Sequence, residues 1–530
     1  MNDMSAAPVA HRARVSAREL KSWLNDGGEI ALLDVREHGR YGEGHLFFSV
    51  SVPYSRLEPE ARRLVPRRST RVVVYDGGDE GVADRAARRL AALGYSRVFV
   101  LDGGAAGWAE AGFQLFAGVN VPSKTFGELA EIAFHTPRIG ALELSERLAK
   151  GENLVVLDGR PVEEYRKMSI PTAVCCPNGE LALRAGALAP DPTTTIVVNC
   201  AGRTRSIIGA QTLIDMGVAN PVFALENGTQ GWYLEDLVLD RGANRLYPPP
   251  PPEAALPRLR RQARAFADAW KVPFVSAFEV EAFRADTVWT TYLCDVRTPE
   301  EFAAASLPGA RSTPGGQLVQ ATDQYLGTRM ARVVVFDGEG VRAPVIAARL
   351  RQMGWDAMVL AEGVFATLTP CEEAPLALPD LPAVSTRELA AMGTGATLLD
   401  LRSSPAYRAE HLKGAIWTIR PRLGDLALPS SGPVILITDS AEVARLAALE
   451  LTERGVRDLR LHLADPAGWA AAGLGTEATP DVPADAECID FLFFVHDRHS
   501  GNKAAARQYL AWETDLIAQI DADERASFRI

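Results

Sequence analysis

The clearest pattern of apolar and polar positions lies between residues 195 and 217. The β-branched run at 196–198 is typical of a buried parallel strand. After a polar stretch, apolar residues at 207, 208, 210, 213, 214 and 216 follow a helical period, and Gly217 stands where a helix C-cap is expected. The pattern predicts a strand, a tight loop and a helix, with Cys200 at the carboxyl end of the strand.

This succession of elements occurs four times along the chain. Each copy begins with an apolar strand ending in Asp-x-Arg, and continues with an aromatic residue, a small-residue turn, a second strand, a helix that ends near a glycine, and a third strand. The Asp-x-Arg pairs are Asp34 and Arg36, Asp158 and Arg160, Asp295 and Arg297, and Asp400 and Arg402. Strands alternating with helices predict small α/β domains with parallel sheets, and we expect each Asp-x-Arg pair to tie a strand end to a neighbouring loop.

These repeats predict the domain organisation. We expect repeat 1 at 1–122, repeat 2 at 123–246, a proline-rich linker at 247–264, repeat 3 at 265–374, repeat 4 at 375–482 and a C-terminal docking segment at 483–530. The linker is indicated by the prolines that follow Tyr247. The last segment is expected to dock because 488–495 is too apolar to stay exposed.

Composition narrows the classes of function. The chain has 530 residues, a net charge of −11 and six cysteines without zinc-ligand spacing. The charge argues against nucleic acid or an anionic membrane as a partner, and the cysteine usage indicates a reducing compartment. We therefore expect a cytoplasmic protein that needs no metal or other cofactor.

The loop after Cys200 carries the candidate chemistry. Backbone N–H groups at the start of a helix have no partner within it, so they converge on a common concavity that attracts an anion. Together with two arginines, they favour the thiolate form of Cys200. The loop residues expected to bind an anionic substrate are Ala201, Gly202, Arg203, Thr204, Arg205 and Ser206.

On these residues and on the fourfold pattern, the chain resembles the rhodanese-like sulfurtransferases. The resemblance covers nearly the whole chain as four tandem copies, each a small parallel sheet flanked by helices. It implies an enzyme of the thiosulfate sulfurtransferase type, in which Cys200 takes sulfur from a small anionic donor as a persulfide. The acceptor would be a thiol or cyanide, with a protein acceptor left open.

Three alternatives compete with this interpretation. Cysteine phosphatases and arsenate reductases of related fold need a longer loop than the four residues between Cys200 and Arg205. A buried structural cysteine is disfavoured by the adjacent arginines. A non-catalytic scaffold that uses Cys200 as a sulfur carrier or sensor stays open.

The other three copies lack the nucleophile. Their equivalent loops begin at Asp76, Asp337 and Thr438 and contain no cysteine. The resemblance therefore implies inactive copies, which either pack around repeat 2, bind partners or close the mouth of its site.

Several further residues are candidates. Arg184 could reach the substrate anion or lie in solvent, and the adjacent Cys175 and Cys176 could pair or simply pack in the core. His496 and His499 could be ligands, but a pair without carboxylate or thiolate partners favours a hydrogen-bonding role.

Overall fold

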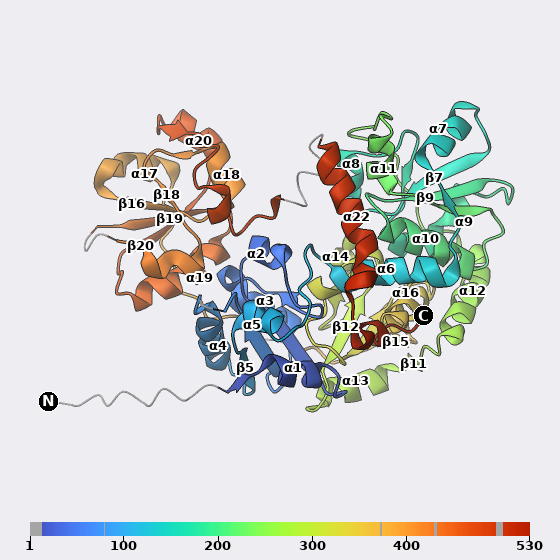
Figure 1. Ribbon diagram of the computed structural model, residues 1–530, viewed down its shortest axis with the longest axis horizontal. Helices are drawn as coiled ribbons and strands as arrows, with labels where there is room; N and C mark the ends of the chain where they lie inside the picture. The colour runs from blue at the N-terminus through green and yellow to red at the C-terminus, as the bar shows by residue number, and fades with distance from the viewer. Residues whose placement is uncertain (1–12, 79, 372–373, 429–431, 494–501) are drawn as a thin grey trace.

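The computed structural model describes residues 13–78, 80–371, 374–428, 432–493 and 502–530 (Figure 1). His496 and His499 lie outside these ranges. Among the described helices, none combines the length and the apolar character that crossing a membrane requires.

Four parallel sheets confirm the predicted α/β fold. The first three share one strand order, β1-β5-β4-β2-β3, β6-β10-β9-β7-β8 and β11-β15-β14-β12-β13, and the fourth is β18-β16-β19-β20. The strands are β1 (Arg14–Val15), β2 (Ile30–Asp34), β3 (Val50–Ser51), β4 (Arg71–Tyr75), β5 (Val98–Leu101), β6 (Arg138–Ile139), β7 (Leu154–Asp158), β8 (Val174–Cys175), β9 (Thr195–Asn199), β10 (Val222–Leu225), β11 (Phe274–Val275), β12 (Thr291–Asp295), β13 (Arg311–Ser312), β14 (Arg332–Phe336), β15 (Asp356–Leu360), β16 (Thr397–Asp400), β18 (Ile416–Trp417), β19 (Val434–Thr438) and β20 (Leu459–Leu463). A separate antiparallel pair joins β17 (His411–Leu412) to β21 (Thr476–Glu477).

Helices separate successive strands of each sheet. Repeat 1 contains α1 (Ala17–Leu24), α2 (His38–Glu43), α3 (Leu57–Leu64), α4 (Val82–Ala92) and α5 (Gly104–Glu110). Repeat 2 contains α6 (Val121–Phe134), α7 (Ala141–Ala149), α8 (Val162–Lys167), α9 (Asn178–Leu188), α10 (Thr204–Asp215) and α11 (Gly228–Leu234). The later helices are α12 (Leu256–Ala269), α13 (Ala277–Ala285), α14 (Pro299–Ala304), α15 (Gly315–Gln320), α16 (Arg342–Gln352), α17 (Thr386–Met392), α18 (Ser404–Ala409), α19 (Ala441–Glu453), α20 (Pro466–Ala471), α22 (Lys503–Gln519) and α23 (Ala522–Ala526).

The alternation of side chains along the buried strands gives each sheet two apolar faces. In β9, Ile196 and Val198 pack in one cluster with residues of α9 and α10, whereas Val197 packs in another with residues of α7 and α11. Because helices cover both faces of the sheet, the strand residues that point to either face are apolar, and they form a continuous apolar run. The predicted glycine after α10, Gly217, adopts a positive φ of 67° just beyond the helix end.

The Asp-x-Arg pairs tie strand ends to loops, as predicted. In repeat 2, Asp158 binds Arg160 through Nε at 2.9 Å and Nη2 at 2.7 Å, and Arg160 Nη2 also donates to the carbonyl oxygen of Met168 at 2.5 Å. The other three pairs make the same double contact, with Gly44, Ala305 and Glu410 as the carbonyl acceptors. This recurrence in all four repeats assigns the pair a structural role.

Repeats 2 and 3 share one apolar core that runs through α6, α9, α10, α12, α15 and α16. They approach each other closely at equivalent positions, at the starts of α9 and α15. A Cβ added at Gly179 would lie 2.7 Å from Gly316 N, and one added at Gly316 would lie 2.8 Å from Gly179 N. Only glycine permits this approach.

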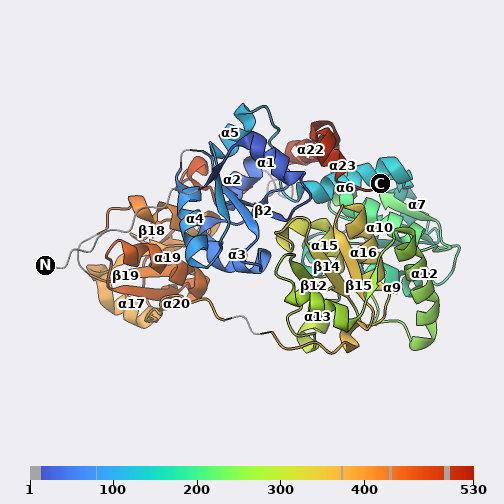
Figure 2. The same cartoon turned by 90° about the horizontal axis from the view of Figure 1, so that it is seen from below.

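Repeat 4 lies beside repeat 1 in both views (Figure 1, Figure 2). Ion pairs connect them: Arg420 binds Glu58 at 2.5 and 2.7 Å, and Arg89 binds Glu450 at 2.8 Å. The chain then returns to repeat 2, where α22 packs against α6 (Figure 1). The C-terminal helix α22 therefore contacts repeat 2, although more than 250 residues separate them in sequence.

Candidate functional site

Cys200 lies at the carboxyl end of β9, and its loop is fixed by the start of α11. Thr229 N donates to Cys200 O at 2.8 Å, and Gln230 N donates to Ala201 O at 3.1 Å. Gly228 makes this contact possible: its φ is +55°, and an added Cβ would lie 2.3 Å from Cys200 O. Hydrogen bonds from α11 therefore hold the backbone at Cys200 and Ala201 in place.

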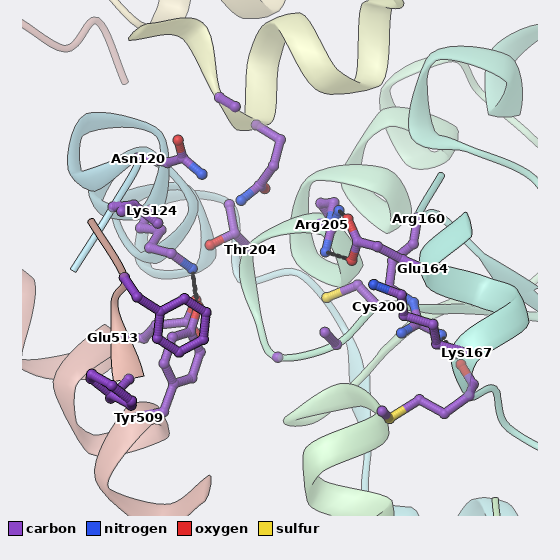
Figure 3. A pocket seen from close by; sticks show the side chains of 18 of the residues that line it. Asn120, Lys124, Arg160, Glu164, Lys167, Cys200, Thr204, Arg205, Tyr509 and Glu513 are labelled. Atoms are coloured by element: carbon purple, nitrogen blue, oxygen red, sulfur yellow. Dashed lines mark hydrogen bonds and ion pairs between the residues drawn. The ribbon is translucent and has the colours of Figure 1, made fainter. Parts of the chain in front are cut away.

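The Cys200 side chain is almost fully buried, with 2% of its surface exposed. Ser206 Oγ donates to its sulfur at 3.1 Å. The residue nevertheless lines a cavity of about 960 Å³ together with Ala201, Gly202, Arg203, Thr204 and Arg205. Figure 3 shows the sulfur directed toward the middle of this cavity. A ligand in the cavity can therefore reach the sulfur.

The loop of repeat 3 that is equivalent to the cysteine loop binds a carboxylate through its backbone N–H groups. Asp337 occupies the position of Cys200, and its carboxylate accepts backbone N–H groups from Gly340 at 2.9 Å, Val341 at 2.9 Å, Arg342 at 2.6 Å and Ala343 at 3.1 Å. These donors correspond to Arg203, Thr204, Arg205 and Ser206 of repeat 2. A loop of this length thus forms a cradle for a negatively charged group.

Arg205 lies in the first turn of α10 and forms an ion pair with Glu164 of α8. Its Nη1 and Nη2 donate to the two carboxylate oxygens at 2.9 and 2.8 Å. Burial acts to lower the pKa of the Arg205 guanidinium, but the charge of Glu164 outweighs it and raises that pKa. Arg342 and Glu301 form the same pair in repeat 3, at 2.9 and 2.7 Å.

Arg203 anchors the loop to α6. Its Nε and Nη2 donate to Glu128 at 2.8 Å each, and Nη2 also contacts Glu131. Burial acts to lower the pKa of Arg203, yet its bonds to Glu128 raise it above the ordinary value. The side chain therefore ties the loop to α6, and the residue also lines the cavity.

One wall of the cavity was not predicted from sequence. Lys124 of α6 is buried and bonded to both Tyr509 and Glu513 of α22 (Figure 3). Glu513 also reaches the cysteine loop, because a Cβ added at Gly202 would lie 2.7 Å from its Oε2. No local motif marks these residues, since only the folded chain brings α22 onto repeat 2.

Arg184 lies away from this cavity. Its Nε donates to Glu180 at 2.6 Å, its Nη1 donates to Pro248 O at 2.6 Å, and its guanidinium lies 4.6 Å from the Tyr247 ring centroid. It is buried rather than solvated. The structure therefore joins Arg184 to the interface with repeat 3, where Glu180 binds Arg342, and does not bring it to Cys200.

The paired cysteines serve the core. Cys175 and Cys176 are both free and fully buried. Burial raises the pKa of Cys175 to about 12 and that of Cys176 well above its ordinary value. The packing interpretation is confirmed, and a disulfide between them is not formed. Within the described ranges, no three His, Cys, Asp or Glu side chains gather in a way that could hold a metal ion.

The domains of this chain match a known protein family. The profile named "Rhodanese-like domain" matches residues 16–111, 141–235 and 277–368. The chain therefore belongs to the rhodanese family. Repeat 4 is outside the matched ranges, although its sheet keeps the order of the central strands.

A solved structure extends the likeness to the whole chain. This protein is similar to the thiosulfate sulfurtransferase from Pseudomonas aeruginosa, with 40% identity over 98% of this chain and 99% of that one, and a TM-score of 0.89. A rhodanese-like domain from Anabaena sp. is 28% identical over 20% of this chain and 80% of its own, with a TM-score of 0.18. No curated protein sequence matches the chain significantly.

Proposed function

We propose that the protein is a sulfurtransferase that moves sulfane sulfur from thiosulfate, or a related donor, to a thiol or to cyanide through a persulfide on Cys200. The main support is the anion cradle that holds Asp337 in repeat 3, because the loop that follows Cys200 in repeat 2 has the same length. Family membership and the similar Pseudomonas aeruginosa enzyme support it.

In the first step, the Cys200 thiolate attacks the outer sulfur of thiosulfate. A sulfur–sulfur bond forms to Cys200, the bond to the sulfonate sulfur breaks, and sulfite leaves with the bonding electron pair. The outer sulfur of the persulfide then carries the negative charge, which the loop N–H groups from Ala201 to Ser206 stabilise. Ser206 Oγ, 3.1 Å from the Cys200 sulfur, adds a side-chain donor.

The second step regenerates the enzyme. The acceptor attacks the outer sulfur, the persulfide bond breaks, and Cys200 leaves as a thiolate. The burial of the sulfur limits access to ligands that enter the cavity. Arg205 contributes positive charge beside the donor, while Glu164 fixes its orientation.

Thiocyanate formation from thiosulfate and cyanide tests this function. Cys200→Ser is expected to reduce the rate to background, whereas Cys371→Ser, which removes an exposed thiol elsewhere, keeps the wild-type rate. A Cys200→Ser protein that still forms thiocyanate would contradict the proposal. A wild-type protein that instead hydrolyses a chromogenic phosphate ester would favour the phosphatase alternative.

A further inference from the structure

A separate cavity, here called the junction cavity, lies where repeat 1, repeat 3 and the C-terminal segment meet. Among the described residues, none lines both this cavity and that of Cys200. Its volume is about 240 Å³, just below the range typical of sites for drug-sized ligands. Arg529 N donates to Gln352 O at 2.7 Å, which holds the C-terminal segment against repeat 3 at this place.

The wall of the junction cavity is largely apolar and aromatic. Repeat 1, repeat 3 and the C-terminal segment all contribute to it, and the large apolar side chains are Phe48, Leu326, Met330, Met353, Trp355 and Phe528. Such a wall favours a ligand with an apolar body, because burial removes apolar surface from water on both sides. A ligand bound here would contact three parts of the chain at once.

Arg329 brings a positive charge into this apolar wall. It is half-buried, and its guanidinium carbon lies 3.4 Å from the centroid of the Phe48 ring. To no described residue does the guanidinium make an ion pair or a hydrogen bond. Its Nε is enclosed without a partner, whereas Nη1 and Nη2 are not enclosed. Burial lowers the pKa of Arg329 to about 10, although the charge of Glu524 acts in the opposite direction.

The carboxylates around the junction cavity have other partners. Glu524 lies 3.7 Å from Lys21 Nζ. Asp323, which lines the cavity, accepts a hydrogen bond from Tyr41 Oη at 3.4 Å, and burial raises the pKa of Asp323 to about 6. Within the described part of the chain, neither carboxylate forms an ion pair with Arg329. The charge of Arg329 therefore has no anion bound to it from the protein.

We infer that the junction cavity is a ligand site distinct from that of Cys200, and that it takes a small organic carboxylate with an aromatic or apolar body. A guanidinium stacked on an aromatic ring keeps its edge accessible, and that edge matches a carboxylate through two parallel N–H···O bonds. Arg329 would bind the carboxylate while the aromatic wall encloses the body. The inference goes beyond the proposed function and does not depend on it.

Calorimetry on the full chain with benzoate and benzamide tests the site. Benzoate is expected to bind the wild type at one site per chain, and benzamide, which is neutral and nearly the same shape, at least tenfold more weakly. Arg329→Gln is expected to weaken benzoate binding at least tenfold. Arg387→Gln, at an exposed arginine of α17 outside the cavity, is the matched control and keeps the wild-type affinity.

A competition experiment distinguishes the junction cavity from the anion cradle at Cys200. Thiosulfate should not displace benzoate, and Cys200→Ser should bind benzoate as the wild type does. Displacement by thiosulfate, or loss of binding in Cys200→Ser, would place benzoate at the cysteine loop and overturn the inference. The outcome is independent of whether Cys200 transfers sulfur.

The thermal unfolding midpoint gives a second measurement. Benzoate is expected to raise the midpoint of the wild type and to leave that of Arg329→Gln unchanged, because a ligand stabilises only the protein that binds it. Equal binding of benzoate and benzamide by the wild type would overturn the site without recourse to any variant. A lower midpoint of Arg329→Gln, together with no effect of benzoate on the wild type, would assign the guanidinium to packing on Phe48 instead.

Discussion

Asp337 occupies in repeat 3 the position that Cys200 occupies in repeat 2. Its carboxylate accepts four backbone N–H groups of the loop, and the same spacing separates Asp337 from Arg342 as separates Cys200 from Arg205. Repeat 3 therefore fills its cradle with its own carboxylate, whereas repeat 2 has the thiol of Cys200 at the equivalent position.

Removing the Asp337 carboxylate is expected to destabilise the protein. Asp337→Ala leaves the four backbone donors of a buried loop without their acceptor, at a cost of about 2 kcal/mol. The measurement is the thermal unfolding midpoint. Asp439→Ala, at an exposed position in the equivalent loop of repeat 4, is the control and should change it little. Equal midpoints for Asp337→Ala and wild type would count against the cradle.

Gly228 is expected to be essential for activity. In Gly228→Ala, the new Cβ would meet Cys200 O at 2.3 Å and the residue would keep a positive φ, so the cysteine loop must shift. We expect at least a tenfold loss of thiocyanate formation, about 1.4 kcal/mol in the barrier.

Gly104→Ala in repeat 1 is the matched control for this substitution. It makes the same collision, 2.4 Å from Asp76 O, in a loop without a cysteine. Both variants should lose similar stability, but only Gly228→Ala should lose most activity. Equal losses of activity would show that the effect is general destabilisation.

The ion pair between Glu301 and Arg342 predicts a pH dependence of stability. Burial acts to raise the pKa of Glu301, but the bonds from Arg342 prevail and lower it to about 2. A depressed pKa means that the pair stabilises the folded state above the unfolded value near 4.5, and that this contribution is lost as the pH falls toward 2.

Urea unfolding of Glu301→Gln tests this dependence. The variant should be less stable than the wild type at pH 7, and the difference should shrink at pH 3. Glu300→Gln, at an exposed neighbouring position, should match the wild type at both values. A difference for Glu301→Gln that is as large at pH 3 as at pH 7 would contradict the lowered pKa.

Local patterns predicted the fold well. The period of apolar residues located β9 and α10, and the recurring Asp-x-Arg pairs identified four similar units, because both signals are determined by residues close in sequence. The placement of Cys200 between a strand and a helix followed for the same reason.

The wall of the cavity formed by α6 and α22 could not be predicted in this way. Lys124, Tyr509 and Glu513 meet only because α22 returns to α6 across nearly four hundred residues of sequence, as the separation of 389 between Lys124 and Glu513 shows. Two positions for Arg184 are compatible with the sequence, because one of its partners, Pro248 O, is 64 residues away and belongs to the segment that follows repeat 2.

Intact mass after brief exposure to thiosulfate tests whether Cys200 carries sulfur, because the measurement detects sulfur on the protein itself. The wild type is expected to gain the mass of one sulfur atom, and cyanide is expected to remove it as thiocyanate. Cys200→Ser should gain nothing, and Cys371→Ser should behave as the wild type. If Cys200→Ser gains sulfur equally, or if no protein gains sulfur from thiosulfate, Cys200 is not the carrier of sulfur from this donor.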